Sequence, residues 1–192
     1  VDVSHFIQLC GEYFAPACVK KNIQFSLSVN QQSLDEKNQP FHIMGEVDAL
    51  EKIVFNFLSN ALKYTPESGE VELGLVTTSE SVRLFVRDSG PGISEEDQKM
   101  LFQVFSQLDS SESREYEGTG LGLALVKSLA EELKGRVGIE SAEGKGSIFW
   151  AEFPLCEASS LEELNFDVKD WLLVEHDVKD WVETVGKIQE TT

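Results

Sequence analysis

Apolar residues recur along the first 155 residues of the chain with two different periods. Steps of three and four residues place apolar side chains on one face of a helix, and they predict helices over 4–21, 48–64 and 119–133, with a short helix from Ser94. Alternation of apolar and polar residues predicts strands over 23–29, 71–76, 82–86, 137–140 and 147–153, with a further short strand around 42–44. This order predicts an α/β two-layer sandwich, in which helices pack on one mixed sheet.

The pattern changes after Pro154, which closes the predicted domain 1–155. Residues 157–192 contain ten acidic residues and three lysines, and apolar residues return at helical spacing from Leu161. Ser160 and Glu163 offer a capping box at the start of this run. We therefore expect residues 156–192 to form an acidic, amphipathic helical extension or a linker to a further domain.

Composition excludes several classes of partner. The formal net charge of −18 opposes long-range attraction to nucleic acid or to an anionic membrane surface, so neither is expected as a partner. No apolar run approaches the ~18 residues of a membrane span, and no signal peptide or initiator Met opens the chain. The three cysteines form no C-x-x-C pair, which favours buried thiols in a reducing compartment. We expect a cytoplasmic piece of a longer protein, whether or not that protein is anchored in a membrane.

Two asparagines four residues apart, Asn56 and Asn60, lie on one face of the helix predicted over 48–64. Asparagine is a poor helix former, so two of them in mid-helix suggest a function, and amide oxygens suit magnesium when phosphates supply the charge. A solvated surface pair is the alternative for this spacing alone. Lys63 and Tyr64 favour a nucleotide, because they add a cation for phosphate and an aromatic ring for a base.

Two glycine-rich segments follow this helix. Asp88 ends a strand and precedes Ser-Gly-Pro-Gly, which is common turn chemistry, but a carboxylate fixed there also accepts a hydrogen bond from the exocyclic amine of adenine. Residues 118–123 run into a helix whose N-terminal N–H groups favour an anion. They are neither a dinucleotide fingerprint, because Leu123 is not glycine, nor a P-loop. Arg114, in the polar stretch 107–117, is placed to reach terminal phosphates, although a loop arginine is more often merely solvated.

In this order and spacing the segments closely resemble the catalytic ATP-binding domain of sensor histidine kinases, in the GHKL superfamily. The resemblance covers residues 1–155. It rests on five motifs, which are the N box, two glycine boxes, the F box and a late glycine turn, at 56–65, 88–93, 118–123, 102–105 and 143–147. It implies the GHKL fold with a mostly antiparallel sheet, ATP and Mg²⁺ as ligands, and a place in two-component signalling.

The resemblance also implies a role for each matching residue. Asn60 is the magnesium ligand, Asn56 supports the metal and the phosphates, and Lys63 contacts phosphate; Asn56 and Lys63 form the catalytic pair. Tyr64 packs on adenine, and Asp88 reads the adenine amine. The remaining cofactor-binding residues belong to the glycine boxes and to the loop between them: Gly90, Gly92, Ile93, Arg114, Gly118, Thr119, Gly120, Leu121 and Gly122.

Two positions modify this expectation. Glu117 stands in the predicted mobile lid 107–117 where many members have glycine, and its carboxylate is expected to weaken phosphate affinity or to stiffen the lid. Asn56 stands where the ATP-hydrolysing relatives, such as gyrase B and heat-shock chaperones, carry a glutamate that activates water. Because an amide is not a general base at neutral pH, we expect a site that positions ATP without efficient hydrolysis, as a kinase requires.

The predicted function is that of a protein-histidine kinase catalytic domain. The chain binds Mg-ATP and donates the γ-phosphate to a histidine on a separate dimerisation and phosphoacceptor domain, with a response regulator or receiver domain downstream. His5, His42 and His176 are interpreted as structural, so we expect no self-phosphorylation by this fragment. Two alternatives stay open: an ATP-sensing or protein-interaction module of the same fold without phosphotransfer, and a GHKL ATPase, which Asn56 disfavours.

Overall fold

The computed structural model describes residues 1–30, 32–33, 41–102 and 122–156. The chain divides into two compact units, Val1–Leu155 and Cys156–Thr192, and the description below concerns the first. Its described elements, in chain order, are α1 (Val3–Lys20), β1 (Gln24–Val29), β2 (Gln32–Ser33), α2 (Val47–Tyr64), β3 (Glu70–Thr77), β4 (Ser81–Asp88), α3 (Glu95–Gln98), α4 (Gly122–Glu132), β5 (Arg136–Ser141) and β6 (Ser147–Pro154).

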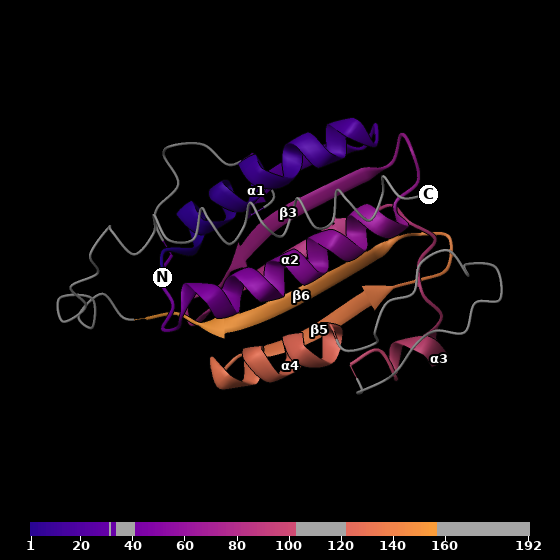
Figure 1. Ribbon diagram of the computed structural model, residues 1–192. Helices are drawn as coiled ribbons and strands as arrows, with labels where there is room; N and C mark the ends of the chain where they lie inside the picture. Colours follow the sequence, from indigo (N-terminus) through magenta and orange to yellow (C-terminus); the bar gives the residue numbers. More distant parts are fainter. Residues whose placement is uncertain (31, 34–40, 103–121, 157–192) are drawn as a thin grey trace. The chain divides into compact units, whose positions relative to one another are not determined.

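The described strands form one mixed sheet in the order β2-β1-β3-β4-β6-β5. Strands β1 and β3 are parallel, and every other neighbouring pair is antiparallel. Helices α1, α2 and α4 lie on one face of this sheet, in front of the strands in Figure 1. The predicted two-layer α/β sandwich with a mixed, mostly antiparallel sheet is therefore confirmed.

The hydrophobic core lies between the helix layer and the sheet. The ring of Phe57 on α2 lies 5.7 Å from that of Phe149 on β6, centroid to centroid. The largest fully buried side chains come from both layers and include Phe57, Phe153, Ile7, Ile43, Leu50, Ile53, Leu58, Leu73, Leu75, Leu84, Val3 and Val54. Because this packing fixes α2 on the sheet, it also fixes the polar residues along the border of the buried stripe of α2.

On the opposite face of the sheet, aromatic rings lie flat over glycines of the neighbouring strands. Phe85 is the direct partner of Gly74, and Trp150 is the direct partner of Gly138. A side chain on either glycine would meet the ring of its partner. The guanidinium of Arg83 lies 4.1 Å above the Trp150 ring. This arrangement shields apolar ring surface from water without a second layer of helices.

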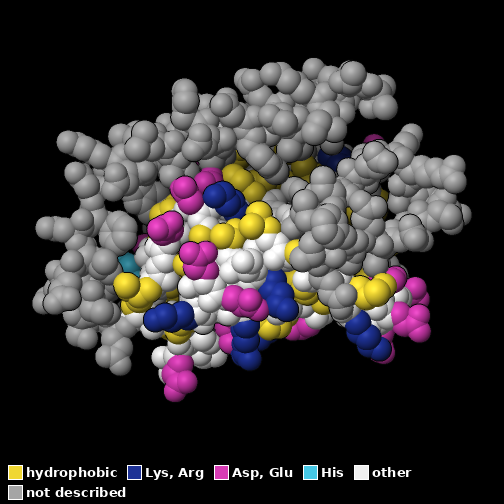
Figure 2. Space-filling view, turned by 60° about the horizontal axis from the view of Figure 1, so that its bottom comes forward, with side chains coloured by type: hydrophobic (Ala, Val, Ile, Leu, Met, Phe, Trp, Pro, Cys, Tyr) yellow, Lys and Arg dark blue, Asp and Glu magenta, His cyan; other side chains and the backbone are white. Residues whose placement is uncertain are grey.

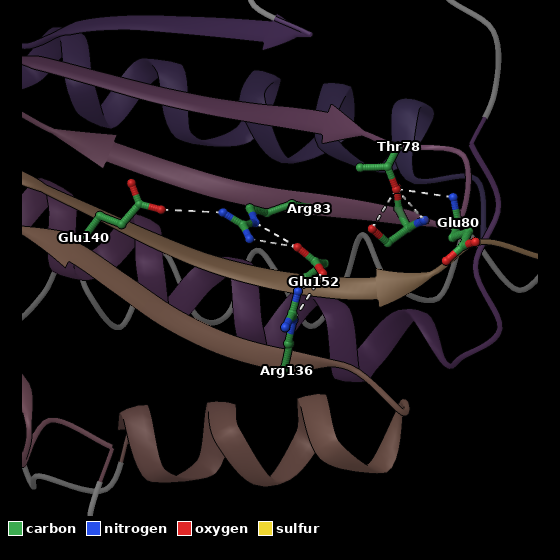
Figure 3. A network of polar contacts seen from close by, with 7 residues as sticks. Thr78, Glu80, Arg83, Arg136, Glu140 and Glu152 are labelled. Carbon is green, nitrogen blue, oxygen red and sulfur yellow. Dashed lines mark hydrogen bonds and ion pairs between the residues drawn. The ribbon is translucent and has the colours of Figure 1, made fainter.

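An ion-pair network holds the charged side chains on that open face. Figure 3 shows Arg83 between Glu140 and Glu152, while Arg136 reaches Glu152 from the edge strand β5. The Arg83–Glu152 and Arg136–Glu152 pairs are 2.9 Å and 2.6 Å long. Burial tends to raise the pKa of Glu152, but hydrogen bonds from Arg136 and Arg83 outweigh it and hold this pKa below its ordinary value.

Charges of both signs share the rest of the described surface. Figure 2 shows lysine, arginine, aspartate and glutamate side chains next to one another on the described part of one face. A further pair, Arg87–Glu72, is 3.1 Å long. Among the residues that the structure describes, no helix has the length and apolar character needed to cross a membrane.

The short strands were not predicted correctly. The strand expected around 42–44 is absent; His42 and Ile43 form isolated bridges with Asp2 and Leu155. Strand β2 was not among the predicted strands. The predicted start of the third helix at 119 lies outside the described residues.

Local caps explain where two helices begin and end. The Ser94 hydroxyl accepts the Asp97 N–H of α3 at 3.2 Å, which is one half of a capping box. The Asp97 carboxylate accepts from the Ser94 hydroxyl rather than from its backbone N–H. After α4, Lys134 takes the left-handed conformation (φ 58°), and the Gly135 N–H donates to Ala130 O at 2.7 Å.

Candidate functional site

The first part of the site is a polar face of α2. Asn56 and Asn60 are both half-buried, and the Asn60 amide nitrogen donates to the Asn56 amide oxygen at 3.3 Å. This contact uses the nitrogen of Asn60 and not its oxygen, which is the atom that binds metals. Lys63 and Tyr64 lie one turn further along, and the Lys63 ammonium lies 5.0 Å from the centre of the Tyr64 ring. Tyr64 is 52% exposed, so its ring is accessible to a planar ligand.

The second part is the carboxyl end of β4, where Asp88 is buried (7% exposed). Its carboxylate accepts the N–H of Gly90 at 2.8 Å and is hydrogen-bonded by the backbone of Ser147 on β6. Burial raises the pKa of Asp88, and these two hydrogen bonds only partly offset that effect. A buried carboxylate with an elevated pKa gains when a ligand N–H reaches it, which suits recognition of an amine.

Two glycines with positive φ pack this loop against the turn between β5 and β6. Gly92 has φ 74°, and a side chain on it would overlap the Ala142 carbonyl. Gly146 has φ 77°, and a side chain on it would overlap the Asp88 carbonyl. The Gly144 N–H donates to Pro91 O at 2.6 Å. Only glycine permits this close approach, which fixes this loop as a wall of the site beside Asp88.

Side chains reinforce the same wall. The Ile93 N–H donates to the Ser141 hydroxyl at 2.9 Å. The Gln98 side-chain amide of α3 donates to Ile93 O at 2.7 Å and to Ser141 O at 2.9 Å. Gln98 thus ties α3 to both the first glycine segment and the end of β5.

Gly90 and Gly122, one from each predicted glycine segment, lie against the α2 residues Tyr64 and Asn56. A side chain on Gly122, at the start of α4, would overlap the Asn56 amide. A Cβ on Gly90 would lie 3.0 Å from Tyr64 O at the other end of that face. Residues far apart in the sequence are therefore brought together around one face of α2.

Comparison with known proteins agrees with this geometry. A family described as histidine kinase-, DNA gyrase B- and HSP90-like ATPases matches residues 45–157. The chain belongs to this family. The sensor protein GacS of Pseudomonas syringae pv. syringae is 36% identical over 80% of the chain and 17% of its own length. The sensor histidine kinase AruS of Pseudomonas aeruginosa is 45% identical over 60% of the chain and 12% of its own length.

Solved histidine kinases share the fold. Full-length ShkA, in complex with AMPPNP, superposes with a TM-score of 0.69 and 31% identity, over 82% of this chain and 31% of that one. The mycobacterial sensor histidine kinase MprB superposes with a TM-score of 0.63 and 25% identity, over 81% of this chain and 95% of that one. The chain is thus a GHKL-type catalytic ATP-binding domain of a sensor histidine kinase, and it spans less than a fifth of the curated relatives named above.

The described part of this ATP-binding domain includes nine of the predicted site residues: Asn56, Asn60, Lys63, Tyr64, Asp88, Gly90, Gly92, Ile93 and Gly122. Arg114, Gly118, Thr119, Gly120 and Leu121 lie outside the described residues, as do the predicted lid 107–117 and most of the F box. Their predicted roles stay predictions.

Sequence reasoning did not assign roles to three polar residues that shape the Asp88 side of the site. Ser147 is buried and lies directly opposite Asp88 in the β4–β6 register, and its hydroxyl lies 3.0 Å from that of Ser141. Ser141 and Gln98 anchor the first glycine segment, as described above. Only Ser147 had a usable signal, because it ends the late glycine turn 143–147 and begins a predicted strand.

The donor set suits magnesium held together with a nucleotide. No group of three or more His, Cys, Asp or Glu side chains in the described ranges is arranged to hold a metal ion. The amides of Asn56 and Asn60 are neutral oxygen donors, and the packing of Gly122 against Asn56 restrains one of them. Neutral oxygen ligands fit a magnesium ion whose charge is balanced mainly by phosphates.

Proposed function

We propose that this domain binds Mg-ATP on the polar face of α2 and donates the γ-phosphate to a histidine on a separate dimerisation and phosphoacceptor domain. The observation that carries the proposal is the convergence of Asn56 and Asn60 with Asp88 and Gly122 around one face of the helix layer. The half-buried amide pair suits the metal, and the buried carboxylate suits the amine of the base. The helix start offers N–H groups to the phosphates of the same nucleotide.

Each residue then has a chemical task. Asn60 ligates the metal, Asn56 supports the metal and the phosphates, and Lys63 offers a cation to them. Tyr64 packs against the adenine, whose amine donates to Asp88. Magnesium, when bound, neutralises phosphate charge and so favours transfer of the terminal phosphoryl group. Arg114 and residues 118–121 complete the phosphate contacts in this proposal.

The chemistry at Asn56 favours phosphate donation over hydrolysis. Its side chain is an amide in contact with the amide of Asn60 and packed against Gly122, and an amide does not take a proton from water at neutral pH. The domain therefore contributes positioning and electrostatic stabilisation, while the attacking nucleophile comes from elsewhere.

The wider setting is proposed from the relatives. The relatives named above are a sensor protein and a sensor histidine kinase, and one solved structure shows the histidine kinase ThkA in complex with the response regulator protein TrrA. Residues 1–155 are proposed to form the catalytic domain of a longer protein. We propose that this domain works in the cytoplasm, with a response regulator or receiver domain downstream. Residues 156–192 are proposed as an acidic helical extension or linker.

Incubation with γ-labelled Mg-ATP tests the phosphotransfer. The isolated chain should take up no acid-labile label on its own. A histidine-phosphoacceptor domain added in trans should become labelled only when this chain is present, and at limiting ATP it should be labelled more slowly when the chain carries Asp88→Asn. Stoichiometric label on the isolated chain would refute the proposed division of labour. Nucleotide binding without any transfer in trans would instead favour an ATP-sensing module.

A further inference from the structure

Helix α2 ends in a way that leaves one of its last carbonyls without a helical partner. In a continuing helix, Leu62 O would accept the N–H of the residue four positions later. That residue is Pro66, which has no N–H. The chain has already left the helix at Thr65, whose ψ is 126°, although the Thr65 N–H still donates to Ala61 O at 2.9 Å. A carbonyl at this place needs a donor from another part of the molecule.

Lys21 supplies that donor. It is the C-terminal cap residue of α1, and its ammonium donates to Leu62 O at 2.5 Å and to Lys63 O at 3.2 Å. A cation at these carbonyls also complements the negative end of the α2 dipole. Partial burial lowers the pKa of Lys21, against the opposing effect of Glu67, so the ammonium is held at a protected position.

The turn that Lys21 caps carries two residues of the proposed site. Lys63 contributes one of the capped carbonyls through its own backbone, and Tyr64 is next in sequence. Tyr64 O lies against Gly90, where a Cβ would come within 3.0 Å. Thr65 is only 1% exposed. The last turn of α2 is thus held between Lys21 on one side and the first glycine segment on the other.

We infer that Lys21 is a positioning residue of the nucleotide site: it fixes the last turn of α2 and so places Lys63 and Tyr64 for phosphate and adenine. This inference rests on the proposed function. In the proposed complex Lys21 does not touch the nucleotide. Lys21 acts through the backbone of Leu62 and Lys63. No sequence motif marks this lysine, because its partners lie 41 and 42 residues away.

The test compares Lys21→Met with Lys20→Met, which removes the same charge from the exposed neighbour. Methionine keeps the length of the side chain but cannot donate. Calorimetric Mg-ATP affinity should fall on the order of fivefold for Lys21→Met and stay unchanged for Lys20→Met. Lys21→Arg, which can still donate to both carbonyls, should recover most of the loss. Equal affinities for the wild type and Lys21→Met would overturn the inference.

Two further readouts separate positioning from general destabilisation. In Lys21→Met, hydrogen exchange at the Thr65 amide should be at least about tenfold faster, while exchange at Val86 in the central strand β4 stays unchanged. In a Tyr64→Ala background, Lys21→Met should cost less affinity than in the wild type, since the two act through one turn. Fully additive losses, or equally faster exchange at both amides, would contradict the inference. A wild type that binds no Mg-ATP would refute the proposed function, and the exchange comparison would still decide whether Lys21 holds the turn.

Discussion

Gly122 at the start of α4 lies so close to Asn56 on α2 that any side chain on Gly122 would overlap the Asn56 amide. The two residues are far apart in the sequence and belong to two different motifs, one rich in amides and one rich in glycine. Their contact joins the helix that carries the proposed metal ligands to the helix start that we propose for phosphate binding. The overlapping atoms are at the end of the Asn56 side chain, so the fold can accept a side chain on Gly122 if the Asn56 amide moves.

Gly122→Ala should therefore separate binding from stability. The new methyl group displaces the Asn56 amide, so we expect Mg-ATP affinity to fall at least about tenfold in calorimetry. Thermal unfolding should change little, because alanine is favoured over glycine in a helix by about 1 kcal/mol, which offsets a local rearrangement. In an Asn56→Ala background the same substitution should have no further effect on affinity. A further tenfold loss there would mean that Gly122 acts on the nucleotide independently of Asn56.

Asp88→Asn should weaken ATP binding and relax the choice of base. The amide loses the charge-assisted hydrogen bond to the adenine amine, which is worth about 1.5–3 kcal/mol, or roughly 10- to 150-fold in affinity. Its NH₂ group can donate to the carbonyl of guanine, so the preference for ATP over GTP should shrink. Competition binding with both nucleotides measures this. Asp48→Asn, an equal charge change at an exposed position of α2, is the control. An unchanged preference would remove Asp88 from the base site.

Asp88→Asn should not destabilise the nucleotide-free protein at neutral pH. Burial raises the pKa of Asp88 above its ordinary value of 3.8, so the folded state holds the proton more tightly than the unfolded state. The contribution of this carboxyl to stability is therefore largest below its ordinary pKa, and it is lost as the pH rises through the folded-state value. Urea unfolding near pH 7 should give Asp88→Asn a free energy of unfolding at least as high as that of the wild type. Near pH 4 the wild type should gain stability relative to Asp88→Asn. The opposite trend would mean that the Gly90 and Ser147 hydrogen bonds outweigh burial.

The buried half of the fold was predictable because its elements repeat a period often enough. The apolar stripe of α2 and the alternation along β4 each specify which face packs against the core, and both were located correctly. The three residues around His42 are too few to show a period, and their bridges to Asp2 and Leu155 depend on tertiary structure. Nor does the local sequence show that Lys134 takes the left-handed conformation after α4 although a glycine follows it.

The candidate site was predictable where residue types are unusual for their element. Two asparagines in mid-helix and an aspartate before glycines stand out in a sequence, and the structure brings them around one face of α2. Gln98, Ser141 and Lys21 did not stand out, because polar residues at such places are ordinary and their partners lie in other elements. Supporting contacts of this kind follow from the topology, not from local sequence.

Calorimetric titration of this chain with ATP, in the presence of Mg²⁺ and after its removal with a chelator, tests the central claim most directly. We predict binding of one nucleotide per chain, with affinity reduced at least about tenfold by the chelator and by Asn60→Ala, and no comparable loss in the exposed control Asp48→Asn. Absence of ATP binding, or binding that ignores both Mg²⁺ and Asn60, would contradict the account.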